Sequence, residues 1–102
     1  MKALNILLAC NAGMSTSIMA RKIREAATAE GYEATVTAVP YAEADEFYGT
    51  ADAVLLGPQI RYAEKDVRAK ASCPVLVMNM QDYGTMNGKK MFHMVLDALA
   101  KA

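Results

Sequence analysis

The sequence predicts an α/β fold built on an open four-stranded parallel sheet of strand order 2-1-3-4, with helices on both faces. Three observations predict it. Short apolar runs alternate four times with segments of helical character, which is the pattern of βαβ units. The runs are largely unbroken, as in strands that are buried on both faces of a sheet. Right-handed crossovers between parallel strands then leave few possible arrangements.

Four strands are expected, over residues 3–9, 34–39, 53–56 and 75–78. The first is apolar except for Asn5, and the second is rich in β-branched residues. Gly57-Pro58 closes the third strand, and Pro74 opens the fourth. Each run is short and bounded by residues that favour turns, so each predicts a buried strand.

Helices are expected over residues 15–30, 40–48, 62–71 and 89–101. Gly31 and Gly49 are the stop signals of the first two, and Pro40 suits the first turn of the second. The segment 79–88 is rich in turn residues, so we expect a loop there. The last helix carries an apolar stripe that consists of Met91, Phe92, Val95, Leu96 and Leu99.

Composition excludes several classes of protein. The 102 residues carry 11 Lys or Arg and 11 Asp or Glu, so the formal net charge is zero. A nucleic-acid partner is not expected, because phosphate neutralisation needs clustered basic side chains. Insertion into a membrane is not expected either, since no apolar run approaches ~20 residues and no signal-peptide pattern is present. We expect residues 1–102 to form a single soluble, cytoplasmic domain with its own core.

The two cysteines show neither a disulfide pattern nor a metal-binding pattern. Cys10 and Cys73 are far apart in sequence, whereas a secreted disulfide scaffold of this length would carry four or more cysteines. A zinc site would need further thiols or imidazoles, and His93 is the one histidine in the chain. We therefore expect no metal and no cofactor.

The loop after the first strand is the predicted site. In flavodoxin-like sheets of this strand order, ligands bind beyond the carboxyl end of the first strand, where the winding reverses. Cys10-Asn-Ala-Gly-Met-Ser-Thr-Ser17 stands there. Gly13 permits a tight curl, and the first amides of the following helix attract anions and favour the thiolate form of Cys10. A nucleophile beside a phosphate cradle indicates phosphoryl transfer through a phosphocysteine, although a core cysteine followed by helix-capping hydroxyls would look similar residue by residue.

These residues resemble a known family. Cys10-Asn-Ala-Gly-Met-Ser-Thr-Ser17, Leu55-Leu-Gly-Pro-Gln-Ile-Arg-Tyr62 and Asp82-Tyr83-Gly84 are similar to motifs of the enzyme IIB components of the lactose/cellobiose type in the bacterial phosphoenolpyruvate-dependent sugar phosphotransferase system. The resemblance implies that Cys10 accepts a phosphoryl group from a histidine of a helical IIA protein. It implies that the group passes to a β-glycoside, such as cellobiose, lactose or diacetylchitobiose, in the membrane component IIC, at the inner face of the membrane. The implied phosphate loop consists of Asn11, Ala12, Gly13, Met14, Ser15, Thr16 and Ser17.

Three alternatives remain open at this stage. The loop also resembles that of low-molecular-weight tyrosine phosphatases, in which an arginine stands where this chain has Thr16. That arginine would stabilise the hydrolytic transition state, so Thr16 argues for a phosphocysteine that water attacks slowly. An arsenate reductase would need a resolving cysteine close to Cys10, and Cys73 is the one candidate. A phosphate- or flavin-binding module would leave Cys10 without a chemical role.

Several other residues are candidates by their position. Gln59, Arg61 and Tyr62 follow the third strand and are expected at the same sheet edge as Cys10, as phosphate contacts, partner contacts or solvated turn residues. Asp82 and Tyr83 follow the fourth strand, where they serve a turn, cap the last helix or take part in chemistry. Met14 is an apolar side chain in the loop and a candidate for docking two unlike partners in turn. Cys73 and His93 are expected to have structural roles.

Overall fold

The four-stranded sheet is the framework of the protein. The computed structural model describes residues 2–11 and 13–101, with the side chains of residue 2 and of residues 13–16 outside that description. The sheet has the order β2-β1-β3-β4, and every pair of neighbours is parallel. This confirms the predicted strand order. The strands are β1 (Lys2–Cys10), β2 (Tyr32–Pro40), β3 (Ala53–Leu56) and β4 (Val75–Val77).

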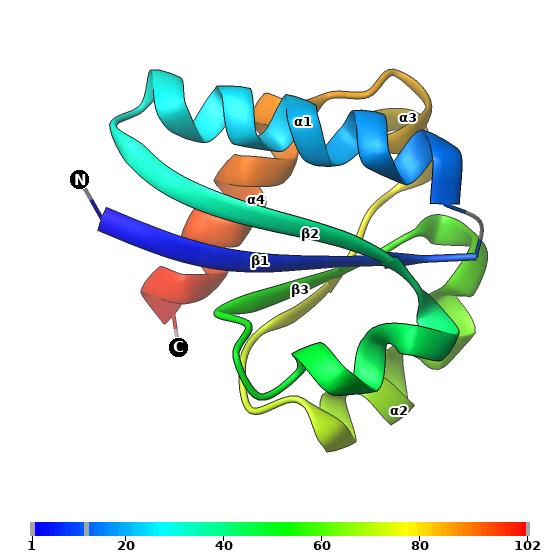
Figure 1. Cartoon of the computed structure of the whole chain (residues 1–102). Helices are drawn as coiled ribbons and strands as arrows, with labels where there is room; N and C mark the ends of the chain where they lie inside the picture. Colours follow the sequence, from blue (N-terminus) through cyan, green and yellow to red (C-terminus); the bar gives the residue numbers. More distant parts are fainter. Residues whose placement is uncertain (1, 12, 102) are drawn as a thin grey trace.

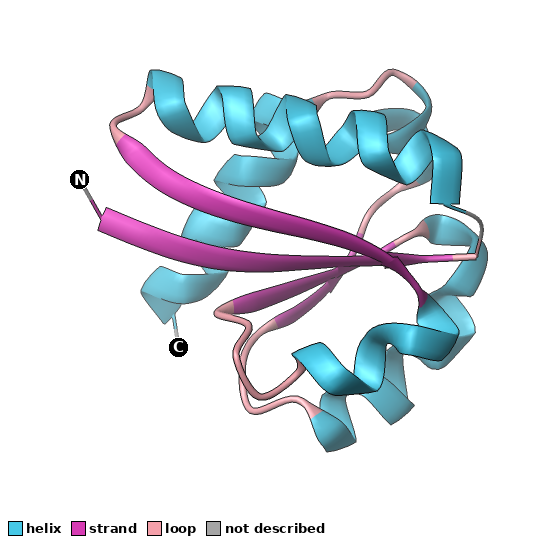
Figure 2. Cartoon of the chain, in the orientation of Figure 1, coloured by secondary structure: helices cyan, strands magenta, loops and turns pink. Residues whose placement is uncertain are grey.

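Helices cover both faces of the sheet, as predicted (Figure 1). On one face lie α1 and α4, and on the other lie η1, η2 and α2, where η denotes a 3₁₀ helix (Figure 2). The short α3 follows β4. Their bounds are α1 (Gly13–Ala29), η1 (Tyr41–Phe47), η2 (Pro58–Ala63), α2 (Glu64–Lys70), α3 (Met80–Gly84) and α4 (Gly88–Lys101).

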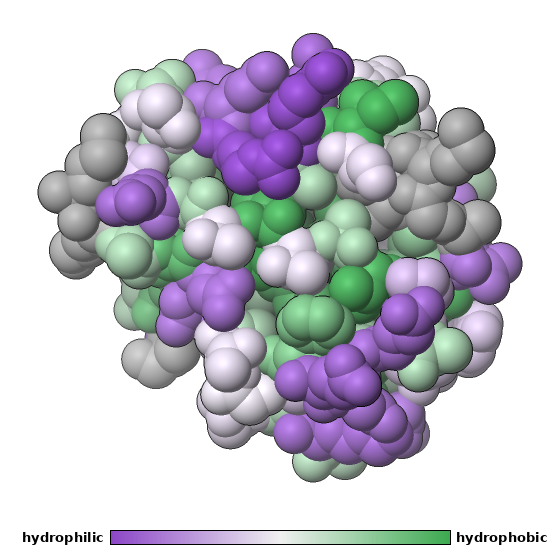
Figure 3. Space-filling view, viewed as in Figure 1, coloured by the Kyte–Doolittle hydropathy of each residue, from purple (hydrophilic) through white to green (hydrophobic). Residues whose placement is uncertain are grey.

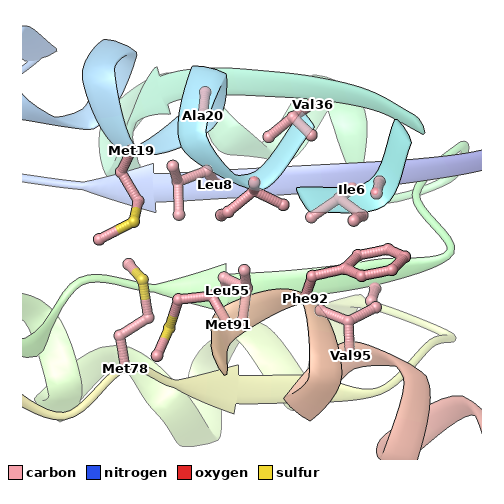
Figure 4. Packing of buried hydrophobic residues seen from close by; sticks show 13 residues of the cluster. Ile6, Leu8, Met19, Ala20, Val36, Leu55, Met78, Met91, Phe92 and Val95 are labelled. Atoms are coloured by element: carbon pink, nitrogen blue, oxygen red, sulfur yellow. The ribbon is translucent and has the colours of Figure 1, made fainter. Parts of the chain in front are cut away.

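Alternation along β1 divides the core into two clusters. Successive side chains of a strand point to opposite faces, so Ile6 and Leu8 face α1 and α4, while Leu7 and Ala9 face η1, η2 and α2. Figure 4 shows the first cluster, in which Leu8 and Leu55 of the sheet pack together with Met19 of α1 and Met91 of α4. Phe92 of α4 contacts Tyr32 of β2 edge to face, with the ring centroids 5.3 Å apart. The central strand is therefore fixed from both sides.

Helices α1 and α4 touch at a glycine. A Cβ atom placed on Gly88 would lie 2.4 Å from the backbone carbon of Lys22 and 2.5 Å from its oxygen. No side chain fits in that space, so Gly88 lets the first residue of α4 rest against the backbone of α1. Because α1 also begins at the predicted site, this contact contributes to fixing its position.

The connecting segments differ from the sequence prediction. Helix α1 begins two residues earlier than expected, and the predicted helix 40–48 is a 3₁₀ helix that follows Pro40. The predicted helix 62–71 is α-helical only over α2, because Tyr62 and Ala63 belong to η2. Helix η2 starts at Pro58 and is itself kinked at Ile60, with φ −118° and ψ 30°. The expected loop 79–88 contains α3, where the side chain of Asn79 accepts a hydrogen bond of 2.7 Å from the backbone N–H of Asp82.

Candidate active site

Cys10 is the last residue of β1, at the carboxyl edge of the sheet. It pairs with Pro40 of β2, and β3 lies on the other side of β1. The residue is 1% exposed in the structure, and its surroundings therefore fix the direction of its side chain. This is the place where the strand order reverses, so the predicted position of Cys10 is confirmed.

Helix α1 begins three residues after Cys10. The 17 residues of α1 give it a full helix dipole, whose positive end lies at Gly13. Its first turn contains no acidic residue, so no carboxylate of the helix competes with an anion for its first amides. Gly13 is the first helical residue instead of a loop residue, and the link from Cys10 consists of two residues.

The structure describes part of the predicted phosphate loop. Asn11 and Ser17 are exposed. Ala12 lies outside the described residues, and so do the side chains of Met14, Ser15 and Thr16. The docking role considered for Met14 and the consequence of Thr16 therefore remain predictions.

Gly57 directly follows β3 and lies beside Cys10. Its backbone N–H donates a hydrogen bond of 2.9 Å to the carbonyl oxygen of Ala9, so the ladder between β1 and β3 continues one residue past β3. A Cβ atom placed on Gly57 would lie 3.0 Å from the Cβ of Cys10 and 3.1 Å from Oε1 of Gln59. The side chain of Gln59 therefore folds back over Gly57, on the side where Cys10 stands.

Two further elements begin at the same edge of the sheet. Helix η2 follows β3 and α3 follows β4. Between them lies a small pocket of about 190 Å³. Tyr62 and Met80 are each 75% exposed, and Arg61 is also exposed. The pocket is lined by Pro58, Arg61, Val77, Met78, Asn79 and Met80.

A comparison with protein families shows which family this chain belongs to. The family described as the lactose/cellobiose-specific IIB subunit of the phosphotransferase system matches residues 5–93. The chain belongs to this family. As a IIB component it is a phosphotransferase in the general sense, and its role implies IIA and IIC components as partners.

Curated relatives of this IIB component serve different sugar systems. The oligo-beta-mannoside-specific EIIB component of Bacillus subtilis (strain 168) is 39% identical over 97 residues, covering 92% of this chain and 94% of the relative. The galactose-specific EIIB component of Lactococcus lactis subsp. cremoris (strain MG1363) is 41% identical over 93 residues, covering 83% of this chain and 86% of the relative.

Two solved structures are similar to this IIB component. The cellobiose-specific IIB protein of Borrelia burgdorferi has a TM-score of 0.79 and 34% identity, and the similarity covers 97% of this chain and 94% of that one. The lactose-specific IIB domain of Streptococcus pneumoniae has a TM-score of 0.83 at 19% identity, and the similarity covers 95% of this chain and 98% of that one. This likeness shows the shared fold.

Asp82 of the IIB component is held by structural contacts. Its side chain is 8% exposed, and Oδ2 accepts a hydrogen bond of 2.7 Å from the side chain of Asn79. The same oxygen lies 3.2 Å from Nζ of Lys90 in α4. Asp82 therefore joins α3 to α4 and does not cap the last helix, which is the role of Asn87 through its bond to the Lys90 N–H. Tyr83 is half-buried and packs on the core formed with α1 and α4.

Cys73 and His93 occupy structural positions. Cys73 is half-buried at the opposite edge of the sheet from Cys10, and burial, aided by the charge of Asp52, raises the pKa of its thiol. The imidazole of His93 contacts the carboxylate of Glu30, which links α4 to the end of α1.

Within residues 2–11 and 13–101, no group of three or more His, Cys, Asp or Glu side chains is arranged to hold a metal ion. In the same ranges, no helix is long and apolar enough to cross a membrane.

A larger surface pocket of the IIB component lies away from Cys10. It has a volume of about 680 Å³ and is lined by residues of α1 and of the beginning of β2, including Arg21, Arg24 and Tyr32. Tyr32 pairs with the first residue of β1, whereas Cys10 is its last. Figure 3 shows this side of the molecule, with hydrophilic side chains over α1 and more apolar ones over the neighbouring β2.

The contact between Gly57 and Cys10 was missed by the sequence analysis. Gly57-Pro58 has the pattern of a turn, which hides the close approach of the glycine to the neighbouring strand. The contact depends on the register that aligns Ala9 with Leu56 and so places Gly57 next to Cys10, and no local pattern in the sequence specifies that register.

Proposed function

We propose that Cys10 carries the phosphoryl group in this IIB component, accepting it from a phosphohistidine of a IIA protein. Cys10 then passes it to a β-glycoside of the cellobiose, lactose or diacetylchitobiose type in the membrane component IIC during uptake. The observation that supports this most strongly is the position of Cys10, at the end of the central strand and three residues before the N-terminus of α1. We further propose that residues 1–102 act as one cytoplasmic domain, which meets the inner face of the membrane through IIC.

The first step is an in-line displacement at phosphorus. A lone pair of the Cys10 thiolate forms the S–P bond while the N–P bond to the histidine of IIA breaks, and that electron pair returns to the imidazole nitrogen. The amides at the start of α1, within the loop from Asn11 to Ser17, donate hydrogen bonds to the phosphoryl oxygens. These donors are in place before the reaction, so little reorganisation is needed.

The second step reverses the role of the sulfur atom. A hydroxyl oxygen of the sugar forms an O–P bond while the S–P bond breaks, and the electron pair returns to Cys10 as thiolate. The hydroxyl proton goes to a base, which we place in IIC. Thiolate is a good leaving group when it is stabilised by the helix N-terminus, so the same feature serves both steps.

Exposed apolar side chains support docking at this edge. In the described part of the chain, the large apolar side chains that are exposed are Ile18 at 46%, Tyr62 at 75% and Met80 at 75%. They belong to α1, η2 and α3, the elements that follow β1, β3 and β4 at the carboxyl edge. Two successive partners must each bring a reacting group to Cys10, so both use this surface in turn.

The choice of sugar is assigned to IIC in this proposal. The two curated relatives are named for oligo-β-mannosides and galactose, although they are 39% and 41% identical to this chain over similar lengths. The site around Cys10 needs only to receive a hydroxyl group, and the rest of the sugar is bound elsewhere.

The experiment measures sugar phosphorylation with phosphoenolpyruvate, the general phosphotransferase proteins, a lactose/cellobiose-type IIA and membranes that contain a matching IIC. Wild-type protein should support formation of sugar phosphate, whereas Cys10→Ser should not. Hydrolysis of an aryl phosphate by the protein alone tests the phosphatase alternative. Rapid turnover at neutral pH would contradict the carrier function, because a carrier must protect its phosphocysteine from water.

A further inference from the structure

Gln59 and Gly57 lie beside Cys10. Gly57 continues the β1–β3 ladder through its hydrogen bond to Ala9, which fixes its position relative to Cys10. The point where a Cβ of Gly57 would stand is 3.0 Å from the Cβ of Cys10 and 3.6 Å from its Cα. A side chain there would push against Cys10, so the glycine keeps this side of the cysteine open.

The amide of Gln59 lies over this glycine. Its Oε1 is 3.1 Å from the same point, which places the amide group close to Cys10 although the residue as a whole is exposed. A glutamine amide carries two N–H donors beside its oxygen, and rotation about the last bond of the side chain presents either group. Among the described residues, no hydrogen bond holds this amide, so it can turn toward a new acceptor.

We propose that the side-chain amide of Gln59 donates a hydrogen bond to the phosphoryl group on Cys10, and that Gly57 provides the room for it. This inference rests on the proposed function of Cys10. The amides of α1 approach the phosphoryl group from the chain that follows Cys10, and Gln59 approaches it from η2, the helix that follows the neighbouring strand β3. The amide adds a donor without the positive charge that an arginine would supply, which suits a phosphocysteine that is kept and not hydrolysed.

Two substitutions of Gln59 test the inference. Gln59→Met keeps the length of the side chain and removes the donors, while Gln59→Glu places a negative charge beside the phosphoryl group. Matched controls are Gln81→Met and Gln81→Glu, because Gln81 is an exposed glutamine on α3, at the same edge of the sheet. The protein is phosphorylated from phosphoenolpyruvate through a lactose/cellobiose-type IIA, and its initial rate and ³¹P chemical shift are measured.

We expect Gln59→Met to slow phosphorylation about 3- to 10-fold, the effect of one hydrogen bond, and to shift the ³¹P resonance of the phosphocysteine. Gln59→Glu should be slower still, while the Gln81 variants should match the wild type in both measurements. A purely structural role of Gln59 would leave the ³¹P resonance of the phosphorylated protein unchanged. Wild-type rate and resonance in Gln59→Met would overturn the inference alone, whereas a wild-type protein that accepts no phosphoryl group would overturn the proposed function with it.

Gly57→Ala tests the second half of the inference. We expect it to slow phosphorylation more than Gly49→Ala, since a Cβ on Gly49 would meet nothing within 4 Å. Urea unfolding of both variants identifies any loss of the fold, and the Gln59 variants remain decisive if Gly57→Ala does not fold. A folded Gly57→Ala protein with the wild-type rate and ³¹P resonance would contradict the assignment of Gly57.

Discussion

Oδ2 of Asp82 lies 3.2 Å from Nζ of Lys90, and this ion pair ties α3 to the first turn of α4. The carboxylate is buried, while the side chain of Lys90 is 57% exposed. Asn79 donates a second hydrogen bond to the same carboxylate. The Asp82 carboxylate therefore holds α3 at the carboxyl edge of the sheet, where we propose that partners dock. Its oxygen already accepts these structural contacts.

Asp82→Asn should therefore lower the free energy of unfolding by about 1–3 kcal/mol, because it weakens hydrogen bonds to a charged group. It should leave phosphorylation of Cys10 within about 2-fold of the wild type, a change smaller than one neutral hydrogen bond supplies. Urea unfolding and the rate of phosphorylation from IIA measure the two effects. Loss of phosphorylation in a variant of unchanged stability would show that Asp82 takes part in the chemistry.

Gly88→Ala should destabilise the protein by about 1–3 kcal/mol, the usual cost of adding a methyl group to a closely packed contact. The new Cβ would meet the backbone of Lys22, which cannot turn away as a flexible side chain would. Gly84→Ala is the matched control, since nothing lies within 4 Å of its added Cβ. Urea unfolding of both variants provides the comparison, and equal stability of the two would refute the close contact.

Tyr41 should titrate at unusually high pH. Its hydroxyl donates a hydrogen bond of 2.6 Å to Asp66, which, with burial and the charge of Asp66, raises the pKa of Tyr41 to about 12. The same hydrogen bond lowers the pKa of Asp66. Asp66→Asn should move the pKa of Tyr41 back toward its ordinary value of 10.0.

Ultraviolet absorbance follows this titration well, because the chain has five tyrosines and no tryptophan. Tyr41→Phe identifies the transition that belongs to Tyr41. A raised pKa in the folded state stabilises the protein fully below pH 10, and this contribution is lost as the pH rises toward 12. The wild type should thus lose more stability than Asp66→Asn across this interval, and identical tyrosine titration curves for the two proteins would exclude the hydrogen bond.

Tyr62→Asp should weaken the functional interaction with IIA. Tyr62 is 75% exposed at the sheet edge that carries Cys10. A negative charge at this position would lie within the apolar surface that we propose for IIA docking. The KM for phosphorylated IIA should rise about 5- to 30-fold, as for loss of an interface anchor, while Tyr62→Phe should stay within about 2-fold. Steady-state phosphorylation at varied IIA concentration measures this. An unchanged KM in Tyr62→Asp would place the docking surface elsewhere.

The strands and the position of Cys10 could be predicted because both depend on local signals. Each strand is a short apolar run, and the crossover rule then places Cys10 at the edge where the winding reverses. Helix α3 escaped prediction because five residues carry too little periodicity to be distinguished from a turn.

The contacts around the site depend on register and could not be predicted in the same way. Gln59 reaches toward Cys10 because the pairing of Ala9 with Leu56 aligns the ends of two strands. Gly88 meets Lys22 because two helices that are distant in sequence pack on the same face. Such relationships depend on the packing of the whole sheet and leave little trace in any one segment.

Intact-mass measurement of phosphorylation tests the role of Cys10 most directly. The protein is incubated with phosphoenolpyruvate, the general phosphotransferase proteins and a lactose/cellobiose-type IIA that phosphorylates a known IIB. We predict the addition of one phosphoryl group to the wild type and to the matched control Cys73→Ser, and none to Cys10→Ser. A wild-type protein that gains no mass, or a Cys10→Ser protein that gains as much as the wild type, would contradict the assignment of phosphoryl transfer to Cys10.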